Sequence, residues 1–267
     1  MEQAFPPWID THCHLDDPAF DDIRDETLAG ARTAGVGHIL NIGYRPERWT
    51  TTLALAARSP MVSVSLGIHP GHADEFSAES LDELARLVEV EKPVAIGEIG
   101  MDFFWDGPSA ESQRDALLKQ LELAKRAGLP AIIHQRAAES EILQVFAAAP
   151  RLPRLVLHSF DGSAAYVDFA LSVNAMVGVG GLATKQGSAS LRTLLQTIPV
   201  NQIVLETDAP YLIPSGARGR KNIPANIPVI GRRLAPLWGL DEESFARITT
   251  TNARRTFGFP GDVKKAG

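Results

Sequence analysis

Six residues of types that often bind metal ions are spread along the sequence, and each lies within or just after a short apolar run. They are four imidazoles and two carboxylates: His12, His14, Glu98, His134, His158 and Asp208. Imidazole nitrogens together with carboxylate oxygens suit divalent cations such as Mg2+, Mn2+ or Zn2+. Six ligands are too many for one tetrahedral structural site. The pattern therefore predicts two divalent ions with open positions for water and substrate.

The first two histidines lie two residues apart in the stretch Asp10-Thr11-His12-Cys13-His14. Side chains two apart on a strand point to the same face, so Asp10, His12 and His14 should converge. A neighbouring carboxylate such as Asp10 could then orient one of the imidazoles. Buried unpaired carboxylates and imidazoles are costly, and a shared cation is the simplest reason for six of them at strand ends.

Position along the chain suggests how the six residues divide between two ions. Glu98 is the expected bridge, with His12, His14 and Asp208 on one ion and His134 and His158 on the other. Glu206 should share a strand face with Asp208 and add a further contact. The predicted catalytic residues are Asp208, as acceptor of a proton from water, Glu98 and His69.

The elements that must position these residues are eight short apolar runs separated by longer amphipathic or alanine-rich stretches. The runs are Trp8–His14, His38–Gly43, Met61–His69, Pro93–Gly100, Pro130–His134, Leu155–Phe160, Ala175–Gly180 and Ile203–Asp208. Near-continuous apolar runs are typical of parallel strands that are buried on both faces. The clearest helix is Ser109–Ala127, with Ser109 as N-cap and with Gly128 and Pro130 as stop signals.

Eight strands with helical crossovers predict an α/β protein, a (β/α)8 TIM-like barrel that forms a single domain over residues 1–267. A doubly wound open sheet is the main alternative. In a barrel, the carboxyl ends of all strands open on one face, which would bring the six residues together.

Composition limits the class of protein further. The net charge of -6 and the pI near 5.7 leave no global positive field to attract nucleic acid. The only cysteine, Cys13, excludes an intrachain disulfide and fits a reducing compartment. No secretory signal and no apolar run of about 20 residues is visible. We expect a cytoplasmic protein with no membrane contact and no obligate protein partner.

Other residues near the predicted strand ends are candidates for substrate contacts. His69 should face the open end, where it could contact a phosphate or protonate a leaving group, or else pack against Pro70. Arg136 could point inward to a phosphate oxygen. Arg218, Arg220 and Lys221 form either a local positive patch or a solvated loop. The aromatic run Phe103, Phe104 and Trp105 could stack on unpaired bases, with one or two of its members packed under the loop.

These blocks, taken in order, resemble the TatD family of the amidohydrolase superfamily. The matching stretches are Asp10–Asp16, Ser65–Pro70, Ile96–Asp102, Ile133–Arg136, His158–Phe160, Leu205–Leu212 and Thr251–Phe257. The resemblance implies a TIM-like barrel and metal-dependent hydrolysis, with DNase or phosphodiesterase activity, and it places the family's metal positions on the same six residues. Branches that use a carboxylated lysine as bridge are less similar, since Glu98 stands at the fourth strand.

The chain departs from the family pattern in one loop. A Gly-x-x-Asn-Glu-Pro-like segment usually follows the eighth strand, whereas residues 219–224 read Gly-Arg-Lys-Asn-Ile-Pro. Ile223 therefore stands where a carboxylate is usual. The change leaves the six metal positions untouched and bears on the loop's contacts with substrate.

Three functions remain open from sequence. The first is a nuclease or phosphodiesterase that acts on DNA ends through metal-activated water, with Mg2+ or Mn2+ favoured and Zn2+ also compatible with the ligands. The second is hydrolysis of an ester or amide, such as the ester bond of a D-aminoacyl-tRNA. The third is a catalytically silent scaffold stabilised by metal. Such a scaffold should have lost at least one ligand, whereas every expected ligand position is filled here.

Overall fold

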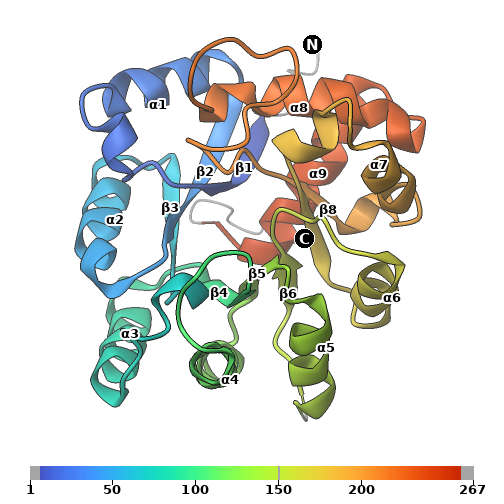
Figure 1. Ribbon diagram of the computed structural model, residues 1–267. Coiled ribbons are helices and arrows are strands. Elements are labelled where there is room, and N and C mark those ends of the chain that lie inside the picture. The colour runs from blue at the N-terminus through green and yellow to red at the C-terminus, as the bar shows by residue number, and fades with distance from the viewer. Residues whose placement is uncertain (1–6, 150, 260–267) are drawn as a thin grey trace, which may run out of the picture.

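Eight parallel strands follow one another in chain order around one sheet in the computed structural model, which describes residues 7–149 and 151–259 (Figure 1). The strands are β1 (Trp8–Cys13), β2 (Val36–Gly43), β3 (Val62–Leu66), β4 (Ala95–Asp102), β5 (Ala131–Arg136), β6 (Leu155–Leu157), β7 (Met176–Val179) and β8 (Ile203–Leu205). Each strand pairs in parallel with the next. Between β8 and β1, the sheet is nearly closed by a bridge from Cys13 to Ala209 and by the Asp208 N–H, which donates to the His12 carbonyl at 2.9 Å.

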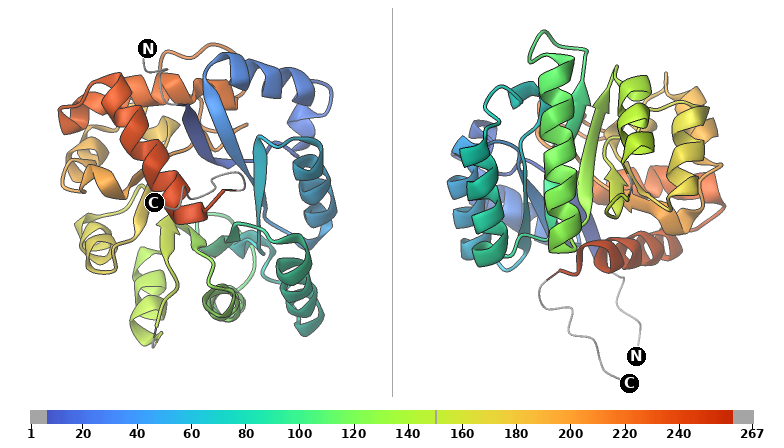
Figure 2. Two further views of the ribbon diagram at one scale, coloured as in Figure 1. Left: turned by 180° about the vertical axis from the view of Figure 1, so that it is seen from behind. Right: turned by 90° about the horizontal axis from the view of Figure 1, so that it is seen from below.

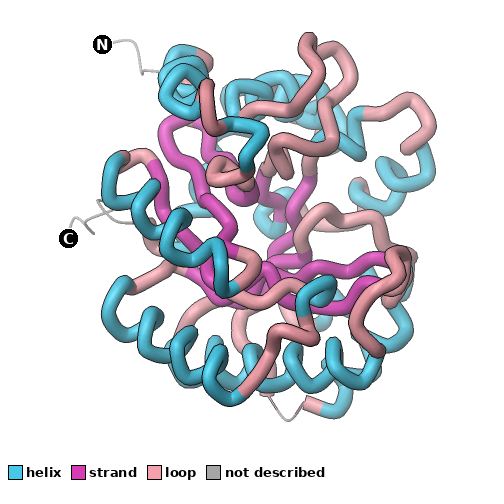
Figure 3. Tube along the Cα trace, turned by 60° about the vertical axis from the view of Figure 1, so that its left-hand side comes forward, coloured by secondary structure: helices cyan, strands magenta, loops and turns pink. Residues whose placement is uncertain are grey.

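Helices lie outside the strands and alternate with them (Figures 1 and 3). They are α1 (Arg24–Thr33), α2 (Pro46–Arg58), α3 (Ala78–Glu91), α4 (Ala110–Ala127), α5 (Glu139–Ala148), α6 (Ala164–Ser172), α7 (Ala189–Leu195), α8 (Ile227–Leu234) and α9 (Glu242–Phe257). The predicted (β/α)8 barrel is confirmed, and the doubly wound open sheet is wrong. Among the described residues, no helix is both long and apolar enough to cross a membrane.

Helix α4 begins and ends at capping residues that can be recognised in the sequence. The Ser109 hydroxyl accepts the Ser112 N–H at 3.1 Å, as expected for an N-cap. The helix ends at Gly128, whose φ of 68° lies in the left-handed region that glycine tolerates best. The predicted bounds of this helix are confirmed.

Several strands end at other residues than predicted at their carboxyl ends, which face the candidate site. β4 continues to Asp102, so Glu98 lies in its middle, because Asp102 still pairs with Arg136 of β5. β3 ends at Leu66, and His69 instead caps a short 3-10 helix, Pro70–His72. β6 and β8 also end early, because the chain turns sharply just after them. Asp208, for example, has a φ of 55°.

The opposite end of the barrel is filled by apolar side chains. Residues from seven strands form an inner cluster with the end of α9: Ile9, Leu40, Ile42, Ala95, Ile132, Val156, Met176 and Val204 with Ala253, Phe257 and Phe259. Helix α9 crosses this end (Figure 2), and the Thr250 hydroxyl donates to the Pro7 carbonyl just before β1 at 2.8 Å. Only the carboxyl ends of the strands are therefore left to form a polar site.

Candidate metal centre

The six predicted ligand residues meet at the carboxyl ends of the strands, around the Glu98 carboxylate. Glu98 Oε1 lies 2.7 Å from His134 Nδ1 and 3.6 Å from His158 Nε2, while Glu98 Oε2 lies 3.4 Å from His12 Nε2. Asp208 Oδ1 is 3.4 Å from His14 Nε2. The same Asp208 oxygen is 3.9 Å from both His12 Nε2 and His158 Nε2. Residues nearly 200 positions apart in the chain thus share one cluster.

The potential ligand atoms form four overlapping groups of three residues, two of which are His12, His158 and Glu206, and His69, Asp102 and His134. The remaining two groups contain the six residues that the sequence analysis divides between two ions. One group comprises His12, His14 and Asp208, and the other comprises Glu98, His134 and His158, with the potential ligand atoms of each group within 4.8 Å of one another. Because Glu98 also approaches His12, its two oxygens face both groups. A carboxylate with one oxygen toward each group is placed where two bound cations would both meet it.

Glycines place Glu98 against its neighbours. Gly97 and Gly100, on either side of it, have φ values of 146° and 151°, which side chains rarely adopt. A Cβ on Gly100 would lie 1.9 Å from the His134 carbonyl oxygen. Only glycine at this position allows β4 and β5 to approach closely enough for Glu98 to reach the His134 ring.

The buried imidazoles carry polar atoms for which the protein supplies no partner. His12 is fully buried, yet neither of its ring nitrogens has a hydrogen-bond partner among the described residues, and the same is true of His14 Nδ1. Burial and the neighbouring His158 lower the pKa of His12, which favours the neutral form that binds metals. Because native proteins rarely leave such atoms unpaired, the residues present fit a divalent cation.

The electrostatic field of the cluster is also suited to cations. Burial alone would raise the pKa of Glu98, but His158, His12 and His69 together hold it well below its usual value. This carboxyl group is therefore ionised at neutral pH despite being almost fully buried.

Negative charge in the cluster raises the pKa of two histidines strongly. Burial would lower the pKa of His134, but Asp102 and Glu98 raise it to about 9. Burial likewise opposes protonation of His158, but Glu206 and Glu98 raise its pKa to about 10. Carboxylates that hold buried imidazolium ions in place are equally able to attract a metal cation to the same position.

Two carboxylates lie behind the rings of His134 and His158. Asp102 Oδ2 is 3.0 Å from His134 Nε2, and Glu206 Oε1 is 3.0 Å from His158 Nδ1. A carboxylate in this position fixes the orientation of an imidazole. The contact of Glu206 was expected from sequence, whereas Asp102 was missed. The alternation of Glu98, Gly100 and Asp102 on one strand face was the signal that could have identified it.

Asp10 has a different task from the one expected. Its carboxylate accepts the Thr207 N–H at 2.9 Å and the Thr207 hydroxyl at 2.6 Å, so it ties β1 to the end of β8. Burial raises its pKa to about 7. The hydrogen bonds recorded for Asp10 do not include an imidazole, and the orienting role predicted for it is wrong.

His69 lies at the edge of the cluster and points one nitrogen toward it. Its Nδ1 accepts the Gly71 N–H at 3.0 Å, and its Nε2 is 3.8 Å from Glu98 Oε1. Burial, aided by the nearby His134, lowers the pKa of His69 to about 3, so the ring is neutral. Since Nδ1 is an acceptor, the proton is on Nε2, and His69 offers a hydrogen-bond donor to the centre.

The basic residues expected to bind substrate lie in three different settings. The Arg136 side chain extends over the Phe104 ring, with Cζ 3.9 Å from the ring centroid. The Lys221 amino group donates to the Ala19 carbonyl and lies over the Phe20 ring, so it is engaged away from the six-residue cluster. Arg218 and Arg220 are exposed in the loop after β8.

The loop after β8 is held by a buried asparagine. The Asn222 amide donates to the Thr207 carbonyl at 2.8 Å and to the Leu212 carbonyl at 3.2 Å. Ile223, where the family usually has a carboxylate, is partly buried and packs against the hydrophobic core. Its side chain thus stabilises the base of the loop.

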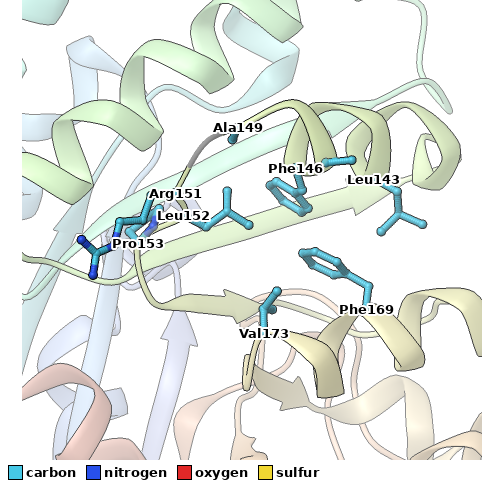
Figure 4. Close-up of a pocket in the computed structure, with 9 residues that line it drawn as sticks. Leu143, Phe146, Ala149, Arg151, Leu152, Pro153, Phe169 and Val173 are labelled. Atoms are coloured by element: carbon cyan, nitrogen blue, oxygen red, sulfur yellow. The ribbon is translucent and has the colours of Figure 1, made fainter.

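A cavity elsewhere on the barrel has a different character. It has a volume of about 440 Å³ and lies between α5 and α6 (Figure 4). Leu143, Phe146, Phe169 and Val173 supply most of its apolar lining. None of the metal-centre residues lines it, so the two features are separate.

We expect a methyl group at Gly178 of β7 to disturb the centre through Glu206. A Cβ at Gly178 would lie 2.2 Å from Glu206 Oε2, and Glu206 is almost fully buried. Gly178→Ala should therefore displace the carboxylate that orients His158 and lower metal affinity and kcat/KM about 10- to 100-fold. Gly187→Ala is the matched control, because its Cβ would meet no atom within 4 Å. Unchanged metal affinity in Gly178→Ala would contradict an orienting role for Glu206.

Comparison with known proteins places this centre among metal-dependent hydrolases. Residues 9–258 match the family model described as TatD related DNase. The chain is 34% identical to the uncharacterized metal-dependent hydrolase YjjV of Escherichia coli, over 95% of this chain and 98% of that one. It is also 34% identical to the 3'-5' ssDNA/RNA exonuclease TatD of Erwinia billingiae, over 94% and 99% of the two chains. The crystal structure of E. coli YjjV superposes with a TM-score of 0.88 over 95% of this chain and 98% of that one.

Proposed function

Because this chain belongs to the TatD related DNase family, we propose that it is a divalent-metal-dependent hydrolase that cleaves phosphodiester bonds of single-stranded DNA or RNA. The observation that carries the proposal is the fully buried His12, whose two ring nitrogens have no hydrogen-bond partner within residues 7–149 and 151–259, although the ionised Glu98 lies beside them. A structural site needs no more than four ligands, whereas this cluster offers six around a shared carboxylate. An open, catalytic arrangement of two ions accounts for all of them.

In this proposal the chain holds two divalent ions. His12, His14 and Asp208 would hold one, His134 and His158 would hold the other, and Glu98 would be shared between them. Mg2+ or Mn2+ suits phosphodiester chemistry, and the four imidazoles also suit Zn2+. When bound, such ions lower the pKa of water and neutralise charge on a phosphoryl oxygen.

The chain's own residues then orient and move protons. Asp208 is partly exposed beside His14, and its carboxylate is placed to accept the proton of an attacking water. His69 donates from Nε2 toward a phosphate oxygen, because its Nδ1 is occupied by the Gly71 N–H. Glu206 and Asp102 keep the rings of His158 and His134 in place.

Positive charge outside the cluster would hold the phosphate backbone. We assign this part to Arg136, Arg218 and Arg220, whose side chains are exposed. Lys221 is omitted from this set, since its amino group is engaged by the Ala19 carbonyl. Three such contacts predict that turnover of an oligonucleotide falls steeply with salt. A flat salt profile would instead indicate a small substrate.

Metal removal tests the proposal directly. The purified protein should degrade a labelled single-stranded oligonucleotide, and treatment with a chelator should lower the rate at least about 1,000-fold, because both activation of water and neutralisation of phosphate charge are lost. Adding Mg2+, Mn2+ or Zn2+ back one at a time should restore the rate and identify the preferred ion. The melting temperature should also fall on chelation, since metal binding stabilises only the folded state.

The same assay, repeated with D-aminoacyl-tRNA as a second substrate, distinguishes the nuclease from the two other functions considered from sequence. Hydrolysis of D-aminoacyl-tRNA at its ester bond with no cleavage of the oligonucleotide would favour an esterase. A fall in melting temperature on chelation with no hydrolysis of either substrate would favour a silent scaffold. Either result would contradict the nuclease proposal.

We also propose a cytoplasmic location. The support is Cys13, the single cysteine, which is free and buried. Burial raises the pKa of this thiol well above its usual value, so it is unreactive and gives no indication of an oxidising compartment. Fractionation of cells that express the tagged chain, with detection by immunoblot, would check the location.

A further inference from the structure

Two aromatic rings stand out into solvent immediately after β4. Trp105 is 66% exposed and Phe104 is 54% exposed, and Trp105 is the most exposed large apolar side chain among the described residues. Their neighbour Phe103 instead packs against the hydrophobic core. Exposure of a large aromatic ring forgoes the stabilisation that burial would give. Two such rings side by side therefore indicate a contact surface rather than a packing need.

A guanidinium group lies on this pair of rings. Arg136 Cζ is 3.9 Å from the centroid of Phe104 and 5.4 Å from that of Trp105, and the two rings meet edge to face at 4.8 Å. The ion pairs recorded within the described part of the chain do not include Arg136. Burial raises the pKa of Asp161, and His134 and then Arg136 act to lower it, so Arg136 lies within electrostatic reach of this carboxyl group. A guanidinium group over a ring face can still donate N–H groups to a phosphate.

This aromatic–arginine surface is joined to the metal centre through one carboxylate. Asp102 Oδ1 accepts the Phe104 N–H at 2.9 Å, and Asp102 Oδ2 is 3.0 Å from His134 Nε2. The Phe103 N–H in turn donates to the Arg136 carbonyl at 2.9 Å. The backbone that carries Phe104 is therefore held by the same residue that contacts a proposed metal ligand.

We propose that Phe104, Trp105 and Arg136 form a stacking platform for an unpaired nucleobase of the strand whose phosphodiester bond is at the metal centre. Flat exposed rings and a stacked guanidinium are the groups that hold unpaired bases without reading their sequence, and the free charge of Arg136 faces the adjoining phosphate. In a duplex the faces of internal bases are covered by their neighbours, so the platform selects single strands. This inference rests on the proposed phosphodiesterase activity and assigns substrate selection to specific residues.

The test compares an oligonucleotide with the same backbone lacking bases. Wild-type protein should cleave the single-stranded oligonucleotide with a kcat/KM roughly 10- to 100-fold above that of the abasic strand, mostly through KM, because stacking contributes only when a base is present. Trp105→Ala should remove most of this preference, by lowering kcat/KM for the base-containing strand toward that for the abasic strand. Trp105→Tyr should restore it, since a flat ring is retained.

Val90→Ala supplies the matched control. Val90 is 60% exposed at the end of α3, away from the proposed platform, so its truncation removes an exposed apolar side chain and should keep the preference for bases. Melting temperatures of all variants should stay close to that of the wild type, because both rings are solvent-exposed. Equal losses on the two strands, or no loss on either, would overturn the platform.

A binding measurement separates failure of the platform from failure of the proposed activity. Anisotropy of a labelled phosphorothioate oligonucleotide, which resists hydrolysis, should show tighter binding than its abasic counterpart in wild type but not in Trp105→Ala. Base-dependent binding without any cleavage of the normal strand would retain the platform and reject the nuclease. Cleavage that ignores the bases would reject the platform alone.

Discussion

Replacement of Glu98 by glutamine should abolish hydrolysis, with kcat lowered at least about 1,000-fold and with loss of bound metal. Glutamine keeps the shape of the side chain, so its fit between Gly97 and Gly100 is preserved. It removes the charge that faces His134, His12 and His158 at 2.7, 3.4 and 3.6 Å. Metal analysis of the purified variant and single-turnover assays with excess protein would measure both effects.

The control for this variant is the same substitution on the surface. Glu242 forms an exposed ion pair with Arg232 at 2.8 Å, and exposed pairs of this kind contribute about 1 kcal/mol or less. Glu242→Gln should therefore keep metal content and turnover within about twofold of the wild type. A Glu98→Gln protein that retains two ions would show that Glu98 is not the bridge.

The fold could be predicted from sequence because buried parallel strands leave a simple pattern. Each of the eight apolar runs overlaps one strand of the barrel, from Trp8–Cys13 to Ile203–Leu205. Their carboxyl ends were harder to predict, because the chain leaves the sheet by turning at single residues. At Asp208 the backbone is in the left-handed region, and a pattern of apolar residues does not predict such a turn.

The meeting of the six proposed ligand residues could be predicted for a related reason. A barrel brings all strand ends to one face, so polar residues at those ends meet whatever their distance in sequence. The residues behind them depend on details of register that sequence does not show. Asp102 reaches His134 only because β4 runs past the predicted end at Gly100. The room for Glu206 depends on Gly178 in the neighbouring strand.

The second large effect is expected from Asp208→Asn. The amide cannot accept a proton from water at neutral pH, and loss of a positioned base typically costs about 100- to 10,000-fold in kcat. Asparagine is the right replacement because Asp208 has a φ of 55°, a conformation that asparagine adopts more readily than alanine. The variant should therefore fold normally, as thermal melting would show.

Metal content separates the two roles that Asp208 could have. Its Oδ1 lies 3.4 Å from His14 Nε2 and 3.9 Å from His12 Nε2, so it belongs to the same group of potential ligands. If the carboxylate acts mainly as a ligand, a higher metal concentration should restore turnover in Asp208→Asn. If it accepts the proton, the variant should stay slow at saturating metal, with KM for the oligonucleotide nearly unchanged, because the defect then lies in the chemical step. Near-wild-type turnover would exclude both roles and move the proton acceptor elsewhere in the cluster.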